Sequence, residues 1–330
     1  MVAWKIATST TFAVALVFVG STSTGFSEEL PGTWSTSTPL PQPRSQHAAI
    51  EFDGKIYAVA GSVPKEDGEG MQNDGASTLV EFYDTATHTW HKGTPLPRPL
   101  THVGLAAVDD KIYSVGGFTA NIHKNAQTAA FVFDPAREQW DELPPLPSPR
   151  GSVATVALNG KVHAIGGRDP NDRLQATHDV YDPENEAWSS AAPLPVARDH
   201  ASIVVANGKI HVIGGRTGDY TDVTDHHHVY DPDSDSWSDA PPMPTPRSGM
   251  AATVYDDMIV VFGGECRDEK TFSDNEGYDL SSKRWKKLRP AEGRHGFGAA
   301  TIGNRAYFVA GAHGCGGEAL GKELLVFTMP

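Results

Sequence analysis

Residues 150–167 read RGSVATVALNGKVHAIGG, and residues 180–188 read VYDPENEAW. The first stretch contains two short runs rich in β-branched residues, joined by Asn159-Gly160, a pair that suits a two-residue type I′ hairpin turn. A glycine pair ends the second run, and the second stretch places Asp182 six residues before Trp188. The unit therefore predicts four antiparallel strands: a hairpin, a variable loop, and two further strands around the Asp.

This unit recurs six times between about residue 31 and the C-terminus. The last glycine of each Gly-Gly doublet, or of the related Ala-Gly pairs, returns every 47 to 56 residues, at Gly61, Gly117, Gly167, Gly215, Gly264 and Gly311. Five units also keep the spacing of six between Asp and Trp: Asp84 and Trp90, Asp134 and Trp140, Asp182 and Trp188, Asp231 and Trp237, Asp279 and Trp285. Four antiparallel strands in each repeat make one blade of a β-propeller.

The doublets, the Tyr-Asp or Phe-Asp pairs and the spaced Trp residues resemble kelch repeats, whose period is about 50 residues. The resemblance implies an all-β fold: a six-bladed kelch β-propeller with four antiparallel strands in each blade. Kelch propellers include an exported sialic-acid mutarotase and a copper oxidase of galactose, to which the resemblance is distant. A fold shared with enzymes does not by itself establish any chemistry.

The sixth unit ends at Leu324-Leu325-Val326-Phe327 without a Trp, whereas Trp34 stands alone ahead of the first doublet. Trp34 lies 56 residues before Trp90, as the outer strand of a preceding blade would. We therefore expect residues 28–43 to supply the outer strand of the last blade. Such closure removes the exposed sheet edges that promote aggregation.

Residues 1–27 contain a single charged residue, Lys5, and an apolar run from Phe12 to Val19, which together predict a secretory signal peptide. The run is too short to span a bilayer comfortably, so we expect no membrane insertion after cleavage; a retained anchor is the alternative. Residues 28–330 then form one propeller domain, exported to the periplasm or the medium and monomeric. Loss of Lys5 changes the formal net charge from -14 to -15, which makes nucleic acid and anionic membranes poor partners.

The start of each first strand suggests a binding site. Positions are counted from Arg150 as zero, and position zero holds Arg44, Leu100, Arg150, Arg198, Arg247 and Arg294. Position plus two holds Gln46, His102, Ser152, His200, Gly249 and Gly296. Position plus four holds Ala48, Gly104, Ala154, Ser202, Ala251 and Gly298. Because side chains alternate along a strand, these three rows are expected to face the same way, and the small residues at plus four predict that this way is the central channel.

Guanidinium groups around one channel mouth would suit carboxylate, sulfate or phosphate ligands. The predicted ligand-binding residues are Arg44, Gln46, His102, Arg150, Arg198, His200, Arg247 and Arg294. The alternative is that the arginines pair with neighbouring carboxylates or carbonyls. Acidic residues recur just before the Tyr-Asp pairs, at Glu81, Asp179 and Glu276, where repetition predicts a scaffold role in place of acid-base chemistry.

The loops between second and third strands carry other reactive residues. His226 and His228, in the fourth loop between second and third strands, are weak candidates for zinc or copper ligands, and we predict no metal and no cofactor. Cys266 and Cys315 follow neighbouring doublets, and an even number of cysteines in an exported chain predicts a disulfide between them. Two free thiols remain the alternative. The first such loop, Ser62 to about Thr78, is the longest and is acidic.

The sequence contains neither a phosphate-binding glycine loop between strand and helix nor a serine nucleophile elbow. We therefore expect a binding module that recognises an anionic carbohydrate or a protein partner through the loop face with the arginines. The alternative is a carbohydrate-active enzyme, a mutarotase, epimerase or oxidase, that uses the channel mouth.

Overall fold

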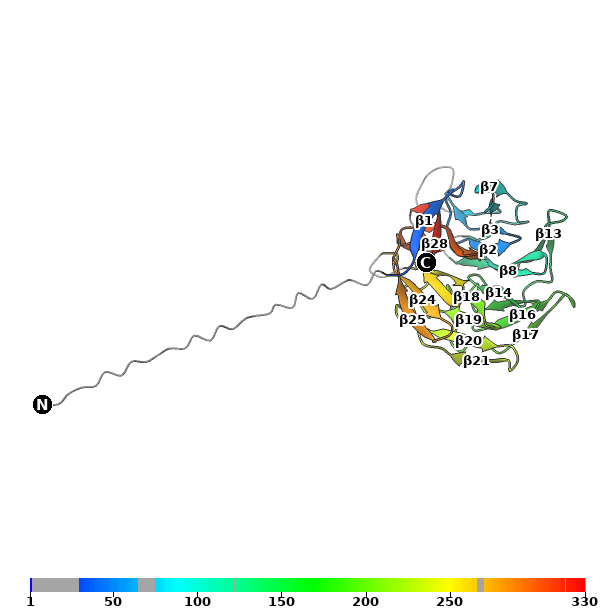
Figure 1. Ribbon diagram of the computed structural model, residues 1–330. Coiled ribbons are helices and arrows are strands. Elements are labelled where there is room, and N and C mark those ends of the chain that lie inside the picture. Colours follow the sequence, from blue (N-terminus) through cyan, green and yellow to red (C-terminus); the bar gives the residue numbers. More distant parts are fainter. Residues whose placement is uncertain (2–29, 65–74, 121–122, 266–269, 318, 330) are drawn as a thin grey trace.

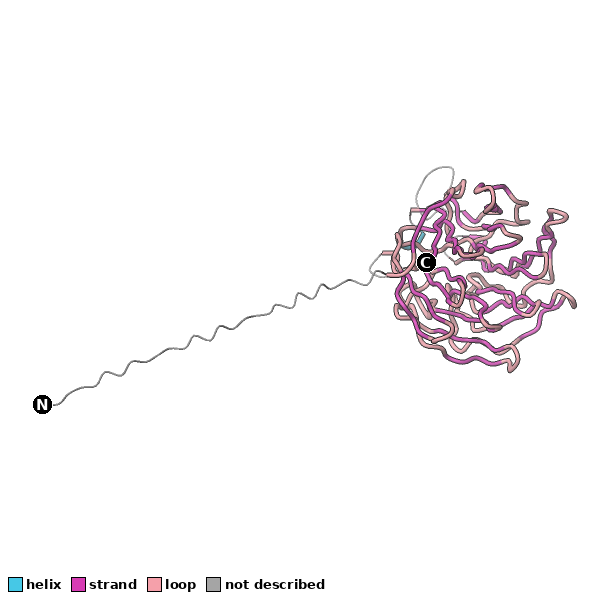
Figure 2. Tube along the Cα trace, viewed as in Figure 1, coloured by secondary structure: helices cyan, strands magenta, loops and turns pink. Residues whose placement is uncertain are grey.

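The computed structural model describes residue 1 and residues 30–64, 75–120, 123–265, 270–317 and 319–329. Six four-stranded antiparallel sheets stand around a central axis, as Figure 1 shows. Strands and loops make up almost all of the described chain (Figure 2), with one short 3-10 turn, η2 (Cys315–Gly317). The predicted six-bladed all-β propeller is therefore confirmed.

Each blade runs from an inner strand at the axis to an outer strand at the rim. The first three blades are β2 (Ala48–Phe52), β3 (Lys55–Val59), β6 (Val80–Asp84) and β7 (Thr89–Lys92); β8 (Gly104–Val108), β9 (Lys111–Val115), β12 (Ala130–Asp134) and β13 (Gln139–Glu142); and β14 (Ala154–Leu158), β15 (Lys161–Ile165), β16 (His178–Asp182) and β17 (Ala187–Ser190). The last three are β18 (Ser202–Ala206), β19 (Lys209–Ile213), β20 (His227–Asp231) and β21 (Ser236–Asp239); β22 (Ala251–Tyr255), β23 (Met258–Phe262), β24 (Asn275–Asp279) and β25 (Arg284–Leu288); and β26 (Gly298–Ile302), β27 (Arg305–Ala312), β28 (Leu320–Thr328) and β1 (Thr33–Ser37). Two small hairpins sit on loops: β4 (Ser62–Val63) with β5 (Gly75–Ala76), and β10 (Phe118–Ala120) with β11 (Lys124–Ala126).

The N-terminal strand closes the ring. Strand β1 pairs antiparallel with β28, with Trp34 opposite Phe327. The indole Nε1–H of Trp34 donates to the carbonyl of Arg289 in the preceding blade connection, 2.8 Å away. The other outer-strand tryptophans make the same kind of bond to the connection before them, from Trp90 to Thr38, Trp140 to Thr94, Trp188 to Pro144, Trp237 to Ala192 and Trp285 to Pro241. The closure predicted from Trp34 is thus confirmed.

Local sequence explains the turns of each blade. Asn159 and Gly160 both have positive φ, 52° and 72°, as a type I′ turn requires. At the Tyr-Asp pair of the first blade, the Asp84 carboxylate accepts hydrogen bonds from the N–H groups of Ala86 and Thr87. Asp stabilises such turns because its short side chain reaches the backbone two residues ahead.

The doublets join neighbouring blades. The second glycine of each pair donates its N–H to the carbonyl at position zero of the next blade, as Gly167 does to Arg198 at 3.0 Å. Gly167 has a φ of 99°, and a Cβ on it would lie 2.8 Å from the carbonyl oxygen of Gly151. Glycine is therefore needed both for the backbone conformation and for the close approach.

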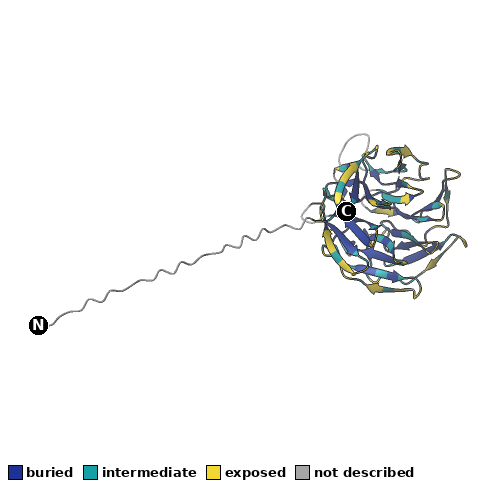
Figure 3. Cartoon of the chain, viewed as in Figure 1, coloured by how far each residue is buried: buried dark blue, intermediate teal, exposed yellow. Residues whose placement is uncertain are grey.

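The hydrophobic core lies between blades, and Figure 3 shows buried inner strands and more exposed outer strands. At plus four, a Cβ on Gly104 would overlap Thr155 of the next blade, and one on Gly298 would overlap Ala49. These glycines let adjacent inner strands approach one another. At Gly104 and Gly298, the close approach of the neighbouring blade explains the small residue. Our expectation that the plus-four row is small because it faces the channel does not hold at these two positions.

Residues 2–29 lie outside the described residues, so the signal peptide over residues 1–27, export and the start of the domain at residue 28 stay predictions. The monomeric state also stays a prediction. Among the described residues, no helix has the length and apolar character needed to cross a membrane.

Candidate functional site

The residues at plus two encircle the mouth of the channel. We call them the collar: Gln46, His102, Ser152, His200, Gly249 and Gly296. All six have positive φ, between 50° and 63°. They precede the inner strands, which begin two residues later, so the alternation that we used to orient positions zero and plus two does not apply there. That part of the sequence reasoning was wrong.

Backbone hydrogen bonds link the collar residues of successive blades. The N–H of His102 donates to the carbonyl of Gln46 at 2.8 Å, and the N–H of Ser152 donates to that of His102 at 3.1 Å. Gly249 bonds in the same way to His200, Gly296 to Gly249, and Gln46 to Gly296. These five bonds satisfy backbone groups that the left-handed conformation takes out of the sheets.

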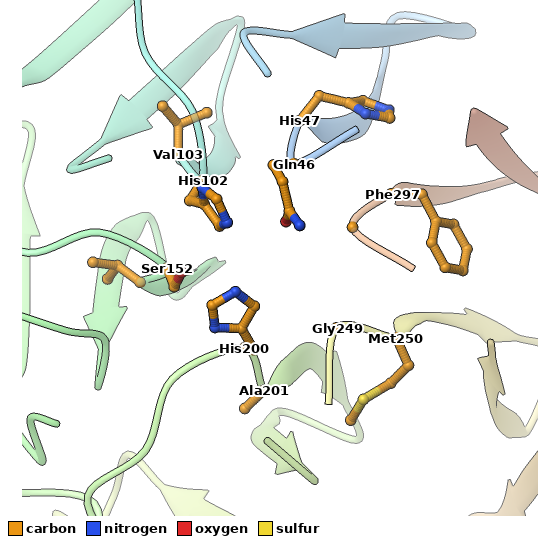
Figure 4. Close-up of a pocket in the computed structure, with 12 residues that line it drawn as sticks. Gln46, His47, His102, Val103, Ser152, His200, Ala201, Gly249, Met250 and Phe297 are labelled. Carbon is orange, nitrogen blue, oxygen red and sulfur yellow. The ribbon is translucent and has the colours of Figure 1, made fainter. Parts of the chain in front are cut away.

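The collar side chains surround a cavity of about 130 Å³. In Figure 4, Gln46, His102, Ser152 and His200 point towards its centre, whereas Phe297 points away. Gly249 and Gly296 contribute no side chain, which leaves the opposite half open. The cavity is therefore asymmetric, with polar groups on one side.

The arginines at position zero lie behind the collar. Arg44, Arg150, Arg198, Arg247 and Arg294 are each 0 to 1% exposed. Four of them pair with a carboxylate of their own blade: Arg44 with Glu81, Arg150 with Asp179, Arg247 with Glu276 and Arg294 with Glu323. The arginines therefore pair with neighbouring carboxylates, as the alternative in the sequence analysis predicted. The same contacts give Glu81, Asp179 and Glu276 a scaffold role, with arginine as the partner.

Arg198 is the exception among these arginines. Its Nη1 lies 2.8 Å from Nδ1 of His228, and its guanidinium also donates to the carbonyls of Val196 and Val212. Burial lowers the pKa of Arg198 to about 10, which leaves the side chain charged at neutral pH. His228 therefore occupies the place of the carboxylate in the fourth blade.

A buried ionic arc runs beside the collar across the third to sixth blades. Arg168 Nε donates to Asp199 Oδ2 at 2.8 Å, and Arg216 pairs with Glu265. Glu265 Oε2 lies 2.9 Å from His295 Nδ1. Burial alone would raise the pKa of Asp199, but His200 and the two arginines hold it well below its ordinary value. Asp199 is therefore a carboxylate at neutral pH.

Three histidines meet at one side of the cavity. His102 and His200 belong to the collar, and His123 reaches them from the hairpin of β10 and β11. Nε2 of His123 lies 3.2 Å from Nε2 of His200, and the three ring centroids are 4.8 to 5.2 Å apart. Sequence reasoning missed His123; the available signal was a histidine in a loop on the same face as the collar.

Burial keeps these imidazoles neutral. It lowers the pKa of His102 well below its ordinary value, that of His200 to about 4 and that of His123 to about 2. Neighbouring positive charge, on Arg216 above all for His200, acts in the same direction. At neutral pH the cavity therefore offers uncharged donors and acceptors.

The other predicted sites have different outcomes. The rings of His226 and His228 stack 5.1 Å apart, whereas His227 turns away and bonds to His211. Cys266 lies outside the described residues, so the disulfide to Cys315 stays a prediction. Most of the long first loop, residues 65–74, also lies outside them.

The comparison with known families agrees with this architecture. Residues 32–215 and 152–329 match the model of the KLHDC2/KLHL20/DRC7 Kelch-repeats domain. The chain belongs to the kelch-repeat family. The resemblance seen in the doublets and spaced tryptophans is thereby confirmed.

The chain is similar over part of its length to several kelch-like proteins. It is 35% identical over 99 residues to Kelch-like protein terF of Aspergillus terreus, covering 28% of this chain and 20% of that protein. It is 32% identical over 88 residues to Kelch-like protein 36 of Bos taurus, covering 27% and 14%. The matches thus span a fifth or less of these relatives. The solved structure of YjhT superposes with a TM-score of 0.74 at 17% identity, over 88% of this chain and 97% of that one, which shows a shared fold alone.

Proposed function

We propose that this kelch propeller is a binding module that captures a segment of a partner protein at its loop face, with one partner side chain inserted into the collar cavity. The observation that carries the proposal is the cavity itself, which is narrow and polar on one side. Kelch-like relatives support a role in protein binding; one from Danio rerio, 30% identical over 92 residues, is named Kelch-like ECH-associated protein 1A.

The volume of the cavity favours a side chain over a whole sugar. Sites for small ligands enclose about 300–1,000 Å³, whereas this cavity measures about 130 Å³. That is enough space for about four water molecules, or for one side chain that displaces them. A partner segment would place the rest of its contacts on the surrounding loops, where binding residues commonly lie.

The chemistry of the lining also bears on the ligand. The arginines expected to attract an anion are engaged in internal pairs, and the groups that face the cavity are an amide, a hydroxyl and neutral imidazoles. These groups favour an uncharged polar side chain, because each can donate or accept a hydrogen bond without a net charge on its partner. An anionic carbohydrate, and catalysis on a sugar, receive less support from this lining.

A pocket-filling substitution tests the proposal. Gly249 has a φ of 63°, which Asn tolerates better than most residues, so Gly249→Asn adds a side chain to the collar. A Cβ there would lie 3.1 Å from Glu265 Oε1, so the Glu265 side chain must move by a few tenths of an ångström to admit it. The matched control is Gly208→Asn, at a φ of 71° in the turn between β18 and β19, where a Cβ meets no atom within 4 Å.

Peptides selected from a displayed random library against the wild-type protein provide the probe. We expect Gly249→Asn to weaken their binding at least about tenfold, a loss of about 1.4 kcal/mol, and Gly208→Asn to leave it unchanged. Equal affinity for both variants, or a library that yields no binder, would refute a binding role for the cavity.

A further inference from the structure

We propose that His102, His123 and His200 bind one divalent transition-metal ion, with Zn²⁺ as the best match, at the side of the channel mouth. One nitrogen from each ring lies within 4.8 Å of the other two. The ion would share His102 and His200 with the proposed capture site, and metal titration tests it without any peptide.

The spacing of the nitrogens suits a tetrahedral ion. Zn–N bonds of about 2.0–2.1 Å imply nitrogen separations of about 3.3–3.4 Å at tetrahedral angles, and the Nε2 atoms of His123 and His200 are 3.2 Å apart. The ring planes meet at 71° to 73° in all three pairs, so each imidazole can aim a lone pair at a common point. The set spans up to 4.8 Å, so the rings would have to close by up to about 1.4 Å around an ion.

Polar side chains stand behind two of the rings. Oγ1 of Thr101 lies 2.9 Å from Nδ1 of His102, and Asp199 Oδ2 lies 3.1 Å from Nδ1 of His200 without forming a hydrogen bond to it. A small rotation of the His200 ring would let its Nδ1–H donate to Asp199 and leave the lone pair on Nε2. A carboxylate behind a ligating histidine is the common arrangement in zinc sites, because it fixes the tautomer and makes the imidazole more basic.

An unsatisfied atom gives independent support. His102 is only 8% exposed, and its Nε2 is buried without a hydrogen-bond partner among the described residues. Burying such a group without a partner costs about 1–3 kcal/mol. A metal ion at this point would supply the missing partner.

The surrounding charge allows a cation. Arg168 and Arg216 stand near the cluster, but the buried carboxylates of Asp199 and Glu265 pair with them, so these four charges cancel. Asp172 is a further partner of Arg168, with a side chain that is 74% exposed.

Three protein ligands leave the fourth position of a tetrahedral ion for water or another ligand, as in zinc sites that are not purely structural. Since His102 and His200 both face the cavity, the fourth position would open towards it (Figure 4).

Isothermal titration of the untagged protein with Zn²⁺ tests the inference. We expect one ion per chain, and a loss of affinity of at least about 100-fold in His123→Ala, which removes a ligand from a loop hairpin. Asp199→Asn, which removes the carboxylate behind His200 and its ion pair with Arg168, should cost about 10–100-fold. His226→Ala is the matched control, because it removes a loop histidine outside the cluster, and it should bind as the wild type does.

Visible spectroscopy with Co²⁺ gives a second readout: the wild type should show the strong bands of a four-coordinate ion, and His123→Ala should not. Melting curves establish that each variant is folded. The inference is overturned if Zn²⁺ binds with the same affinity to His123→Ala, if His226→Ala is the variant that loses binding, or if no stoichiometric binding occurs.

Discussion

Replacement of Trp34 by Ala should destabilise the propeller by about 3 kcal/mol. The Trp34 ring lies 4.9 Å from the ring of Phe262, 5.4 Å from that of Phe308 and 5.0 Å from that of Phe327. Each aromatic pair contributes about 0.5–1.5 kcal/mol, and the Nε1–H bond to Arg289 about 1 kcal/mol. The loss falls at the low end of the about 3–5 kcal/mol measured for Trp→Ala in protein cores, as expected for a half-buried ring.

Urea unfolding measures this loss, and Trp34→Phe is the matched control because it keeps an aromatic ring, although a smaller one, and removes the hydrogen bond. We expect about 1 kcal/mol for Trp34→Phe and about three times as much for Trp34→Ala. The slope of the free energy of unfolding against urea should stay the same if the rest of the ring unfolds as one unit. A loss below about 1 kcal/mol in Trp34→Ala would contradict the view that β1 closes and stabilises the ring.

Three further substitutions or conditions test the packing. Gly104→Ala should cost about 1–3 kcal/mol because its Cβ would overlap the next blade; unchanged stability in urea would show that the strands can separate there. Arg247→Met should cost about 3–5 kcal/mol by leaving Glu276 buried without its arginine, and adding Glu276→Gln should recover most of that loss in the same assay. Acidification should lower the melting temperature, because burial lowers the pKa of His163 and His178 to about 4 in the folded protein. As the pH falls from about 6.5 to 4, these two histidines take up protons in the unfolded chain but not in the folded one. Each of them then lowers the free energy of unfolding by about 1.4 kcal/mol per pH unit. A melting temperature that is the same at pH 7 and pH 5 would contradict this.

Much of the fold was predictable because the repeat acts locally. The turn at Asn159-Gly160 and the spacing from Asp to Trp depend on residues close in sequence, and six copies in register identify a ring of six blades. The closure by Trp34 followed from a missing tryptophan at the other end of the chain. Each of these signals can be recognised in the sequence without knowledge of the tertiary contacts.

The site was less predictable because its contacts are long-range. Arg44 and Glu81 were both noted as recurring residues, but their pairing depends on how strands of one blade pack. The left-handed conformation of His102 and His200 could not be read from histidine, which rarely adopts it. His123 comes from a different loop, and only the folded chain places it against His200.

The central claim is that the protein binds its partner at the collar. The imidazole resonances of His102 and His200, followed by NMR as a selected peptide is added, test it most directly. We expect both to shift to saturation with the peptide, while the exposed His91 on the outer strand of the first blade stays unchanged. Shifts at His91 with none at His102 and His200 would place binding at the rim and contradict the account.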